Sequence, residues 1–480
     1  MIEQSKEPSP EGADVVATHD ISSEKITAAL NEALEWHRKG NLGLAQTAYK
    51  RVLALQPRHP EALNFLGILL QQRKQSTQAE QSIRKAIHCA PHYAAAYTNL
   101  GNVLLVQRRH EEAIAAYQQA IRLRVDEVDA CVNLGAILRG MGRQEEALAA
   151  YQQASQRKPG DPGIHFRLAT LLAEQGHSEQ AIETLWITLR HNPTHEDAIK
   201  LMGNLLHAAG RKEEARELIG KTVFQLGGTE KALSLLQHWL HLMPDDPIAQ
   251  HRLSAWFGGD TPERASNAYV TDLFDRYADS FDSHLQELGY QAPTVLAEYL
   301  AENLDAPTGE WHVLDAGCGT GLCQAFLRPY AQNLVGVDLS SRMLDKARER
   351  GGYDQLVAAE LTAFLNTKYD CYDLILSADT LVYFGNLTDV INAAAHALHA
   401  GGWLAFTAEK ASTDSAPSDG FHLDRSGRYS HTADYLVQTL LAAGMTTPSI
   451  VETTLRQEGD EPVTGYVALA QKPVAEPPAN

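Results

Sequence analysis

The sequence predicts a two-part protein: an all-α solenoid of stacked helix pairs, followed by an α/β domain with a mostly parallel, doubly wound sheet. Small residues recur every 34 positions in the first half, and this period indicates a repeated helix pair. Short apolar runs rich in β-branched residues alternate with helical patterns in the second half, which is typical of a parallel sheet. A chain of 480 residues has room for about two to four domains.

Each repeat has small residues and turn residues at fixed positions. The 34-residue period is carried by Ala33, Gly67, Gly101, Gly135, Ala169 and Gly203. Twelve residues after each of these stands an alanine: Ala45, Ala79, Ala113, Ala147, Ala181 and Ala215. Small residues are needed where the two helices of a unit approach closely. Glycines at positions 40, 142, 176 and 210 permit the left-handed backbone that ends the first helix, and prolines near the unit ends terminate the second.

This pattern resembles the tetratricopeptide repeat. Six units span residues 27–230, and a degenerate segment, Lys231–Met243, is expected to cap the stack because a terminal unit has no neighbour to cover it. The predicted solenoid is therefore 27–257, after a disordered segment at 1–26. Such solenoids present a long concave surface that binds proteins or peptides.

Three asparagines occupy equivalent repeat positions, two residues before the small residue: Asn31, Asn99 and Asn133. An asparagine amide can both donate to and accept from a peptide backbone. The arrangement is similar to the asparagine ladder of O-linked N-acetylglucosamine transferases, which implies a peptide partner on the concave surface. Phe65, Arg167 and Leu201 interrupt the series, and a solvated helix face explains the asparagines equally.

The second half alternates strand and helix after a linker at 258–264. Aromatic and leucine residues at every fourth position from 269 to 285 predict a helix. Expected strands lie at 311–317, 333–339, 355–361, 373–379 and 403–409, and a terminal hairpin is formed by 449–457 and 463–471. A hairpin at the end of an otherwise parallel sheet predicts one antiparallel strand. The tail at 473–480 is expected to be disordered.

A glycine-rich turn after the first strand identifies a nucleoside cofactor. Gly317, Gly319 and Gly321 allow the backbone to approach a ligand closely, and Asp338, at the end of the second strand, can accept both hydroxyls of a ribose. A dinucleotide fingerprint requires glycine at the sixth position, where Leu322 stands. Asp315 before the turn would also repel a pyrophosphate, so an NAD-dependent oxidoreductase is disfavoured. The carboxylate of Asp315 is better suited to S-adenosylmethionine, whose sulfonium and ammonium groups are positively charged.

The motifs VLDAGCGTGL, VGVDLSSRML, VAAEL and YDLILSADTLVYFG resemble successive motifs of class I S-adenosylmethionine-dependent methyltransferases over residues 265–472. With the repeats, the whole chain resembles bacterial methyltransferases that contain tetratricopeptide repeats. The resemblance implies a Rossmann-like domain with a seven-stranded sheet, one strand antiparallel, and S-adenosylmethionine as cofactor. No metal is implied.

The resemblance assigns cofactor contacts to the matching positions. These are Asp315, Gly317, Gly319, Gly321, Asp338, Leu339, Met343, Glu360, Leu361 and Asp379. It implies that Asp315 helps to hold the amino group, that Gly317 and Gly319 pass beside the methionine part, and that Asp338 holds the ribose. Leu339 and Met343 then pack on the adenine, Glu360 and the Leu361 amide read its edge, and Asp379 lines the methyl-transfer centre.

Three further residues are candidates for catalysis. Tyr277 lies in the helix ahead of the sheet, and Tyr383 follows the fourth strand. His431 lies between the fifth strand and the next helix and is the best candidate for a general base, because histidine titrates near neutrality. The alternative is that Tyr277 packs its helix and that His431 only begins one.

Charge and cysteine content constrain the partners. Residues 261–480 contain 13 Lys and Arg but 30 Asp and Glu, an excess of acid that disfavours a nucleic-acid substrate. No run of about 18 apolar residues indicates a membrane span. Five cysteines without CxxC spacing suggest neither disulfides nor zinc and fit the cytoplasm.

We expect methyl transfer to an unidentified acceptor, with a catalytically silent interaction scaffold as the alternative.

Overall fold

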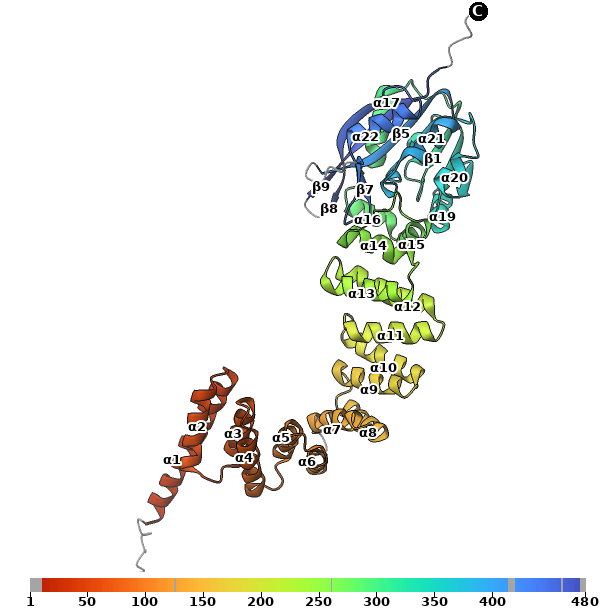
Figure 1. Ribbon diagram of the computed structural model, residues 1–480. Helices are drawn as coiled ribbons and strands as arrows, with labels where there is room; N and C mark the ends of the chain where they lie inside the picture. Colours follow the sequence, from red (N-terminus) through yellow and green to blue (C-terminus); the bar gives the residue numbers. More distant parts are fainter. Residues whose placement is uncertain (1–10, 125–126, 260, 413–418, 459–460, 475–480) are drawn as a thin grey trace, which may run out of the picture. The chain divides into compact units, whose positions relative to one another are not determined.

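The computed structural model describes residues 11–124, 127–259, 261–412, 419–458 and 461–474, with side chains from residue 24 onward (Figure 1). It divides into two compact units, Met1–Leu218 and Ile219–Asn480. None of the described helices is both long and apolar enough to cross a bilayer.

The first unit is built from consecutive antiparallel helix pairs. The helices are α1 (Glu11–Arg38), α2 (Leu42–Leu55), α3 (Pro60–Gln72), α4 (Ser76–Cys89), α5 (Ala94–Val106), α6 (His110–Leu123), α7 (Val128–Gly140), α8 (Gln144–Arg157), α9 (Pro162–Glu174), α10 (Ser178–His191), α11 (Glu196–Ala208) and α12 (Lys212–Leu226), the last of which continues into the second unit. From α1 to α10, each helix packs against its pair partner, and the second helix of each of these pairs also packs against the first helix of the next pair. The predicted helical repeat is confirmed.

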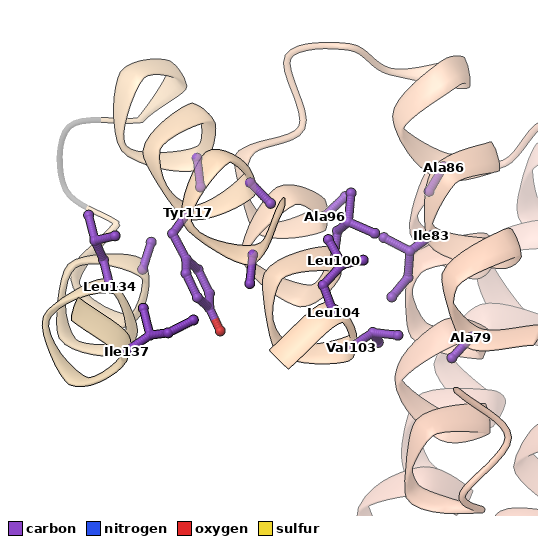
Figure 2. Packing of buried hydrophobic residues seen from close by; sticks show 14 of the residues in the cluster. Ala79, Ile83, Ala86, Ala96, Leu100, Val103, Leu104, Tyr117, Leu134 and Ile137 are labelled. Atoms are coloured by element: carbon purple, nitrogen blue, oxygen red, sulfur yellow. The ribbon is translucent and has the colours of Figure 1, made fainter. Parts of the chain in front are cut away.

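The small residues of the repeat lie where the two helices of a unit meet. A Cβ added to Gly101 would lie 2.5 Å from the Tyr117 ring, and one added to Gly135 would lie 2.7 Å from the Tyr151 ring. Both tyrosine side chains are fully buried. Tyr117 of α6 belongs to the same buried cluster as Ile137 of α7, part of which Figure 2 shows, and α6 packs against α7 of the next unit. The 34-residue spacing of the small residues therefore reflects the close packing of the two helices in each unit.

Replacing Gly101 with alanine is expected to destabilise the repeat unit by about 1–3 kcal/mol, because the methyl group overpacks against a buried ring. Gly140→Ala is the matched control, since Gly140 ends α7, has no positive φ and has no neighbour within 4 Å of an added Cβ. Urea denaturation followed by circular dichroism measures both variants. Equal stability of the two would contradict the packing explanation.

The turn inside each unit uses a left-handed residue whether or not it is glycine. Gly142 has φ +77°, and Lys74 and Arg108 adopt φ +61° and +60° at the equivalent positions of their own units. The period thus fixes the backbone conformation even where the glycine is missing.

Helix α1 includes residues 11–26 of the segment predicted to be disordered. Residues 13–39 contain neither proline nor glycine, so nothing in this stretch interrupts a helix. Residues 1–10, and the part of the predicted disordered tail at 475–480, lie outside the described residues.

The second unit holds a further helix pair and a mixed sheet covered by helices. Its helices are α13 (Glu230–Leu242), α14 (Pro247–Phe257), α15 (Asn267–Tyr277), α16 (Phe281–Glu287), α17 (Ala292–Asn303), α18 (Gln324–Leu327), α19 (Ser341–Arg350), α20 (Leu361–Leu365), the 3-10 turn η1 (Leu381–Tyr383), α21 (Thr388–Ala397) and α22 (Ala433–Ala442). Its strands are β1 (Trp311–Ala316), β2 (Ala331–Asp338), β3 (Gln355–Ala358), β4 (Tyr372–Ser377), β5 (Leu398–Lys410), β6 (Phe421–Leu423), β7 (Tyr429–His431), β8 (Ser449–Glu458) and β9 (Glu461–Gln471).

The strands join in one sheet. Parallel pairing runs in the order β3-β2-β1-β4-β5, and β9 pairs antiparallel with both β5 and β8. This confirms the predicted parallel sheet with a terminal hairpin. Two short strands, β6 and β7, were not expected. Glu409 of β5 pairs with β9 on one side and with Ser430 of β7 on the other, so β7 lies in the space beyond the end of β4.

Candidate functional site

A cavity lies at the carboxyl ends of β1, β2, β3 and β4, where ligands bind in open α/β sheets. Including its open mouth, its space is about 940 Å³. Its walls come from the turns after these strands, from α15 and α16, and from the segment before α15. Because these elements are far apart in the sequence, only the fold brings them together.

The glycine turn forms one wall. Gly317, Gly319 and Gly321 have φ of +80°, +52° and +85°, in the left-handed region that favours glycine. A Cβ on Gly317 would lie 1.9 Å from Thr380 Oγ1, so this position also lacks space for any side chain. Gly317 and Gly319 line the cavity, whereas Gly321 packs against Tyr353 behind it.

Asp338 faces the same cavity from the end of β2. Its Oδ2 accepts a hydrogen bond from the Gly319 amide (2.9 Å) and its Oδ1 accepts one from the Ser340 amide (2.8 Å). These bonds fix the carboxylate beside the turn, and each oxygen keeps a free lone pair. Burial raises the pKa of Asp338, partly offset by these amide donors.

Asp315 lies buried at the end of β1, behind the turn. Its Oδ2 accepts a hydrogen bond from the Tyr353 hydroxyl (2.6 Å), while Oδ1 has no hydrogen-bond partner. Burial raises the pKa of this carboxyl to about 7. Asp315 lies outside the cavity lining. Its unpartnered, buried carboxylate oxygen is costly unless a donor or a cation reaches it.

A third group of residues follows β2 and β3. Leu339, Glu360 and Leu361 line the cavity. Glu360 caps α20, because its carboxylate accepts from the Thr362 (3.1 Å) and Ala363 (2.7 Å) amides. Met343 is fully buried and lies outside the cavity lining, so it can support this wall only from behind.

Helices α15 and α16 cover the cavity. Thr320 Oγ1, in the glycine turn, donates to Asp282 of α16 (2.6 Å), and Ser340 Oγ donates to Asp275 of α15 (2.5 Å). Phe274 and Phe281 line the cavity and meet edge to face, with ring centroids 5.8 Å apart. The cover is therefore tied to the turn and to the start of α19, and its inner face is apolar.

Asp379 and Tyr383 lie at the far end of the cavity, after β4. Asp379 adopts φ +51°, and its Oδ1 accepts from Thr407 Oγ1 (3.0 Å). Its Oδ2 lies 3.6 Å from Nη1 of the buried Arg456. Tyr383 packs edge to face on Phe274, at 5.4 Å between centroids. The cavity is thus lined by the Asp379 carboxylate, which a hydrogen bond holds in place, and by the aromatic rings of Tyr383 and Phe274.

Comparison with known proteins agrees with this geometry. Residues 314–406 match the family model described as a methyltransferase domain, and residues 31–94, 98–162 and 142–217 match tetratricopeptide repeat models. The chain carries tetratricopeptide repeats and a methyltransferase domain. The sequence-based recognition of both parts is confirmed.

The curated relatives that match part of this chain include methyltransferases. Methyltransferase-like protein 27 from Homo sapiens is 37% identical over 111 residues, which are 21% of this chain and 45% of the relative. Malonyl-[acyl-carrier protein] O-methyltransferase from Pseudescherichia vulneris is 32% identical over 138 residues, which are 29% of this chain and 52% of the relative. The chain thus spans about half the length of the curated relatives it matches.

Solved structures resemble the repeats. The crystal structure of MamA is 27% identical, covers 34% of this chain and 94% of MamA, and gives a TM-score of 0.31. A score this low supports no argument about the arrangement of the repeats.

His431 is not among the residues that line the cavity. His431 belongs to β7, is fully buried, and its Nε2 lies 3.0 Å from the Gly385 carbonyl oxygen, to which it donates. Burial lowers its pKa to about 4, and its ring stacks on Tyr435. A ring that is inaccessible and already bonded to the backbone cannot receive a proton from an acceptor in the cavity, so we do not propose it as the base.

Tyr277 also lies outside the cavity lining, where it stacks on His284. The regular spacing from 269 to 285 predicts one helix, but residues 278–280 separate α15 from α16 and change which side chains face inward. Phe274 therefore lines the cavity in place of Tyr277. Tyr290, Arg264 and Asn267 also line it and were not found from the sequence, because no motif marks them.

Proposed function

We propose that the methyltransferase domain binds S-adenosylmethionine in this cavity and transfers its methyl group to an acceptor. The observation that carries the proposal is the convergence, on one cavity, of a side-chain-free turn and the carboxylate of Asp338, with the unpartnered Oδ1 of Asp315 buried behind that turn. A flat, polar, positively charged nucleoside needs these three features together.

Each cofactor contact is proposed from the position of the residue. Asp338 would accept the ribose hydroxyls, Asp315 would face the ammonium group, and Gly317 and Gly319 would allow the amino-acid part to pass. The apolar residues Leu339 and Leu361, with the Leu361 amide, would hold the adenine. When bound, the cofactor supplies an activated methyl group on a sulfonium.

The acceptor would occupy the other half of the cavity. Phe274, Phe281, Leu285 and Tyr290 line this half and would exclude water, which favours a reaction that neutralises charge. No histidine is found in the cavity lining that the structure describes. Asp379 and Tyr383 also line the cavity, and we propose that they orient the acceptor and that Asp379 receives any proton that must leave.

We propose that the repeats recruit a protein or peptide that carries or delivers the acceptor. The Asn99 amide donates to Asn64 Oδ1 and the Asn133 amide donates to Asn102 Oδ1, each at 3.0 Å, across neighbouring units. These bonds hold the amides in place and leave the Asn99 and Asn133 carbonyl oxygens to accept from a backbone. We place this activity in the cytoplasm, with neither nucleic acid nor membrane as substrate.

The test incubates the purified protein with S-adenosylmethionine radiolabelled in its methyl group and a cell lysate. Label in the macromolecular fraction would indicate a protein or carrier-bound acceptor, and label in the small-molecule fraction would indicate a metabolite. Cofactor binding without transfer to any fraction would favour the silent scaffold instead. A protein that does not bind the cofactor would contradict the proposal.

The affinity for S-adenosylhomocysteine is expected to fall as the pH drops below about 7, because Asp315, with its pKa raised to about 7, loses the charge that attracts the ammonium group. The loss should approach, at most, about tenfold per pH unit. Calorimetry between pH 5.5 and 8 measures it. The control ligand is 5′-methylthioadenosine, which lacks the ammonium group. Asp315→Asn should make the two pH profiles parallel, and parallel profiles in the unaltered protein would contradict the assignment.

A further inference from the structure

The segment between α14 and α15 forms part of the cavity wall. Glu263 O accepts hydrogen bonds from the Gly385 and Asn386 amides, and the Ala265 amide donates to Tyr383 O, all at 2.8 Å. Arg264 and Phe384 form an isolated antiparallel bridge. The segment is thus fixed to the loop that follows β4, and it directs Arg264, Ala265 and Asn267 to the cavity.

The Arg264 side chain is held at both ends of its guanidinium. Nη1 lies 2.6 Å from Glu360 Oε1, and Nη2 lies 2.7 Å from Asn267 Oδ1. The group also lies over the Phe384 ring, 5.7 Å from its centroid. Because two acceptors fix its plane, little side-chain entropy remains to be lost when a ligand contacts it.

Glu360 has few free positions for a ligand. Oε1 accepts from Arg264 and the Thr362 amide, and Oε2 accepts from the Ala363 amide. These donors outweigh desolvation and lower the pKa of Glu360. The carboxylate that the family resemblance assigns to the adenine edge therefore acts here as the anchor of an arginine.

We propose that Arg264 is a cofactor-binding residue, and that the Arg264–Glu360 pair, rather than Glu360 alone, forms the adenine end of the cavity. A planar guanidinium stacks on or borders aromatic rings, and Leu339, Ala359 and Leu361 supply an apolar surface in the same cavity. The ligand class is an adenine nucleoside. The inference rests on the proposed function, since it assumes that an S-adenosyl group enters this cavity.

Calorimetry on the full chain tests the inference with S-adenosylhomocysteine and 5′-methylthioadenosine, which share adenosine but differ in the amino-acid part. Arg264→Gln should weaken both by the same factor, about tenfold. Arg264→Lys keeps the charge beside Glu360 but loses the plane, and it should weaken both nearly as much. Arg348→Gln, in an exposed ion pair of α19, is the control and should bind both ligands normally.

The outcomes separate the inference from the proposed function. If the unaltered protein binds both ligands and Arg264→Gln and Arg264→Lys bind them equally well, the inference is overturned and the proposed function stands. A loss confined to S-adenosylhomocysteine would also overturn it, because the effect would then lie at the amino-acid end. If the unaltered protein binds neither ligand, both proposals fail. Unchanged unfolding midpoints confirm that the variants are folded.

Discussion

Replacing Asp338 with alanine is expected to weaken the binding of S-adenosylhomocysteine by about 100-fold or more. The carboxylate is placed by the Gly319 and Ser340 amides, so its remaining lone pairs face the cavity without further reorganisation. Two charge-assisted hydrogen bonds to ribose hydroxyls contribute roughly 1.5 kcal/mol or more each, and both are lost together. Isothermal titration calorimetry on the full chain measures the change.

The control for this variant is Asp345→Asn, which alters an exposed ion pair with Arg348 on α19 and leaves the cavity intact. Asp338→Asn separates two roles of the side chain. It keeps one oxygen as acceptor but loses the charge, and it should bind with intermediate affinity. Tight binding by Asp338→Ala would show that the carboxylate does not hold the ribose, and the cofactor assignment would then lose its main support.

Much of the fold could be predicted because its signals are repeated or local. The 34-residue period appears in the sequence because each unit repeats the same close contact, such as that between Gly101 and Tyr117. The turn after β1 could be predicted because only glycine fits at position 317. The backbone there is left-handed, and Thr380 leaves no space for a Cβ. In both cases one physical constraint restricts one position strongly.

The candidate site could be predicted only where a motif carries it. Asp338 and Gly319 stand in motifs and meet in the structure through a hydrogen bond. Arg264 reaches the cavity because a segment distant in sequence bridges to Phe384, and no local pattern records such a contact. His431 was selected for its residue type, but it belongs to the unexpected strand β7, where its ring is fully buried and burial lowers its pKa. Tertiary contacts therefore decide which polar residues can act.

Replacing Arg456 with methionine is expected to destabilise the methyltransferase domain by about 3–5 kcal/mol, because it removes the hydrogen-bonded counter-ion of the buried Glu409 and leaves it Arg428, whose Nη1 lies 3.5 Å away. Arg456 is only 2% exposed. Its Nη2 donates to Glu409 (2.7 Å) and to Glu458 (2.9 Å), and its Nη1 lies 3.6 Å from Asp379. Urea denaturation of the full chain measures the free energy of unfolding. Arg348→Met removes an exposed arginine as the control and should cost less than about 1 kcal/mol.

The pH dependence distinguishes a buried-charge effect from a simple loss of packing. Burial already raises the pKa of Glu409 even with Arg456 beside it, and removing the arginine should raise that pKa further. A carboxyl whose pKa is higher in the folded state than in the unfolded state costs stability, and this cost grows as the pH rises from the unfolded value to the folded value. The deficit of Arg456→Met should therefore shrink as the pH is lowered, and adding Glu409→Gln should restore part of the stability at pH 7. If neither the pH nor the second substitution changes the stability lost in Arg456→Met, Arg456 stabilises the domain through packing alone. Its charge would then not be needed to hold Asp379 in position.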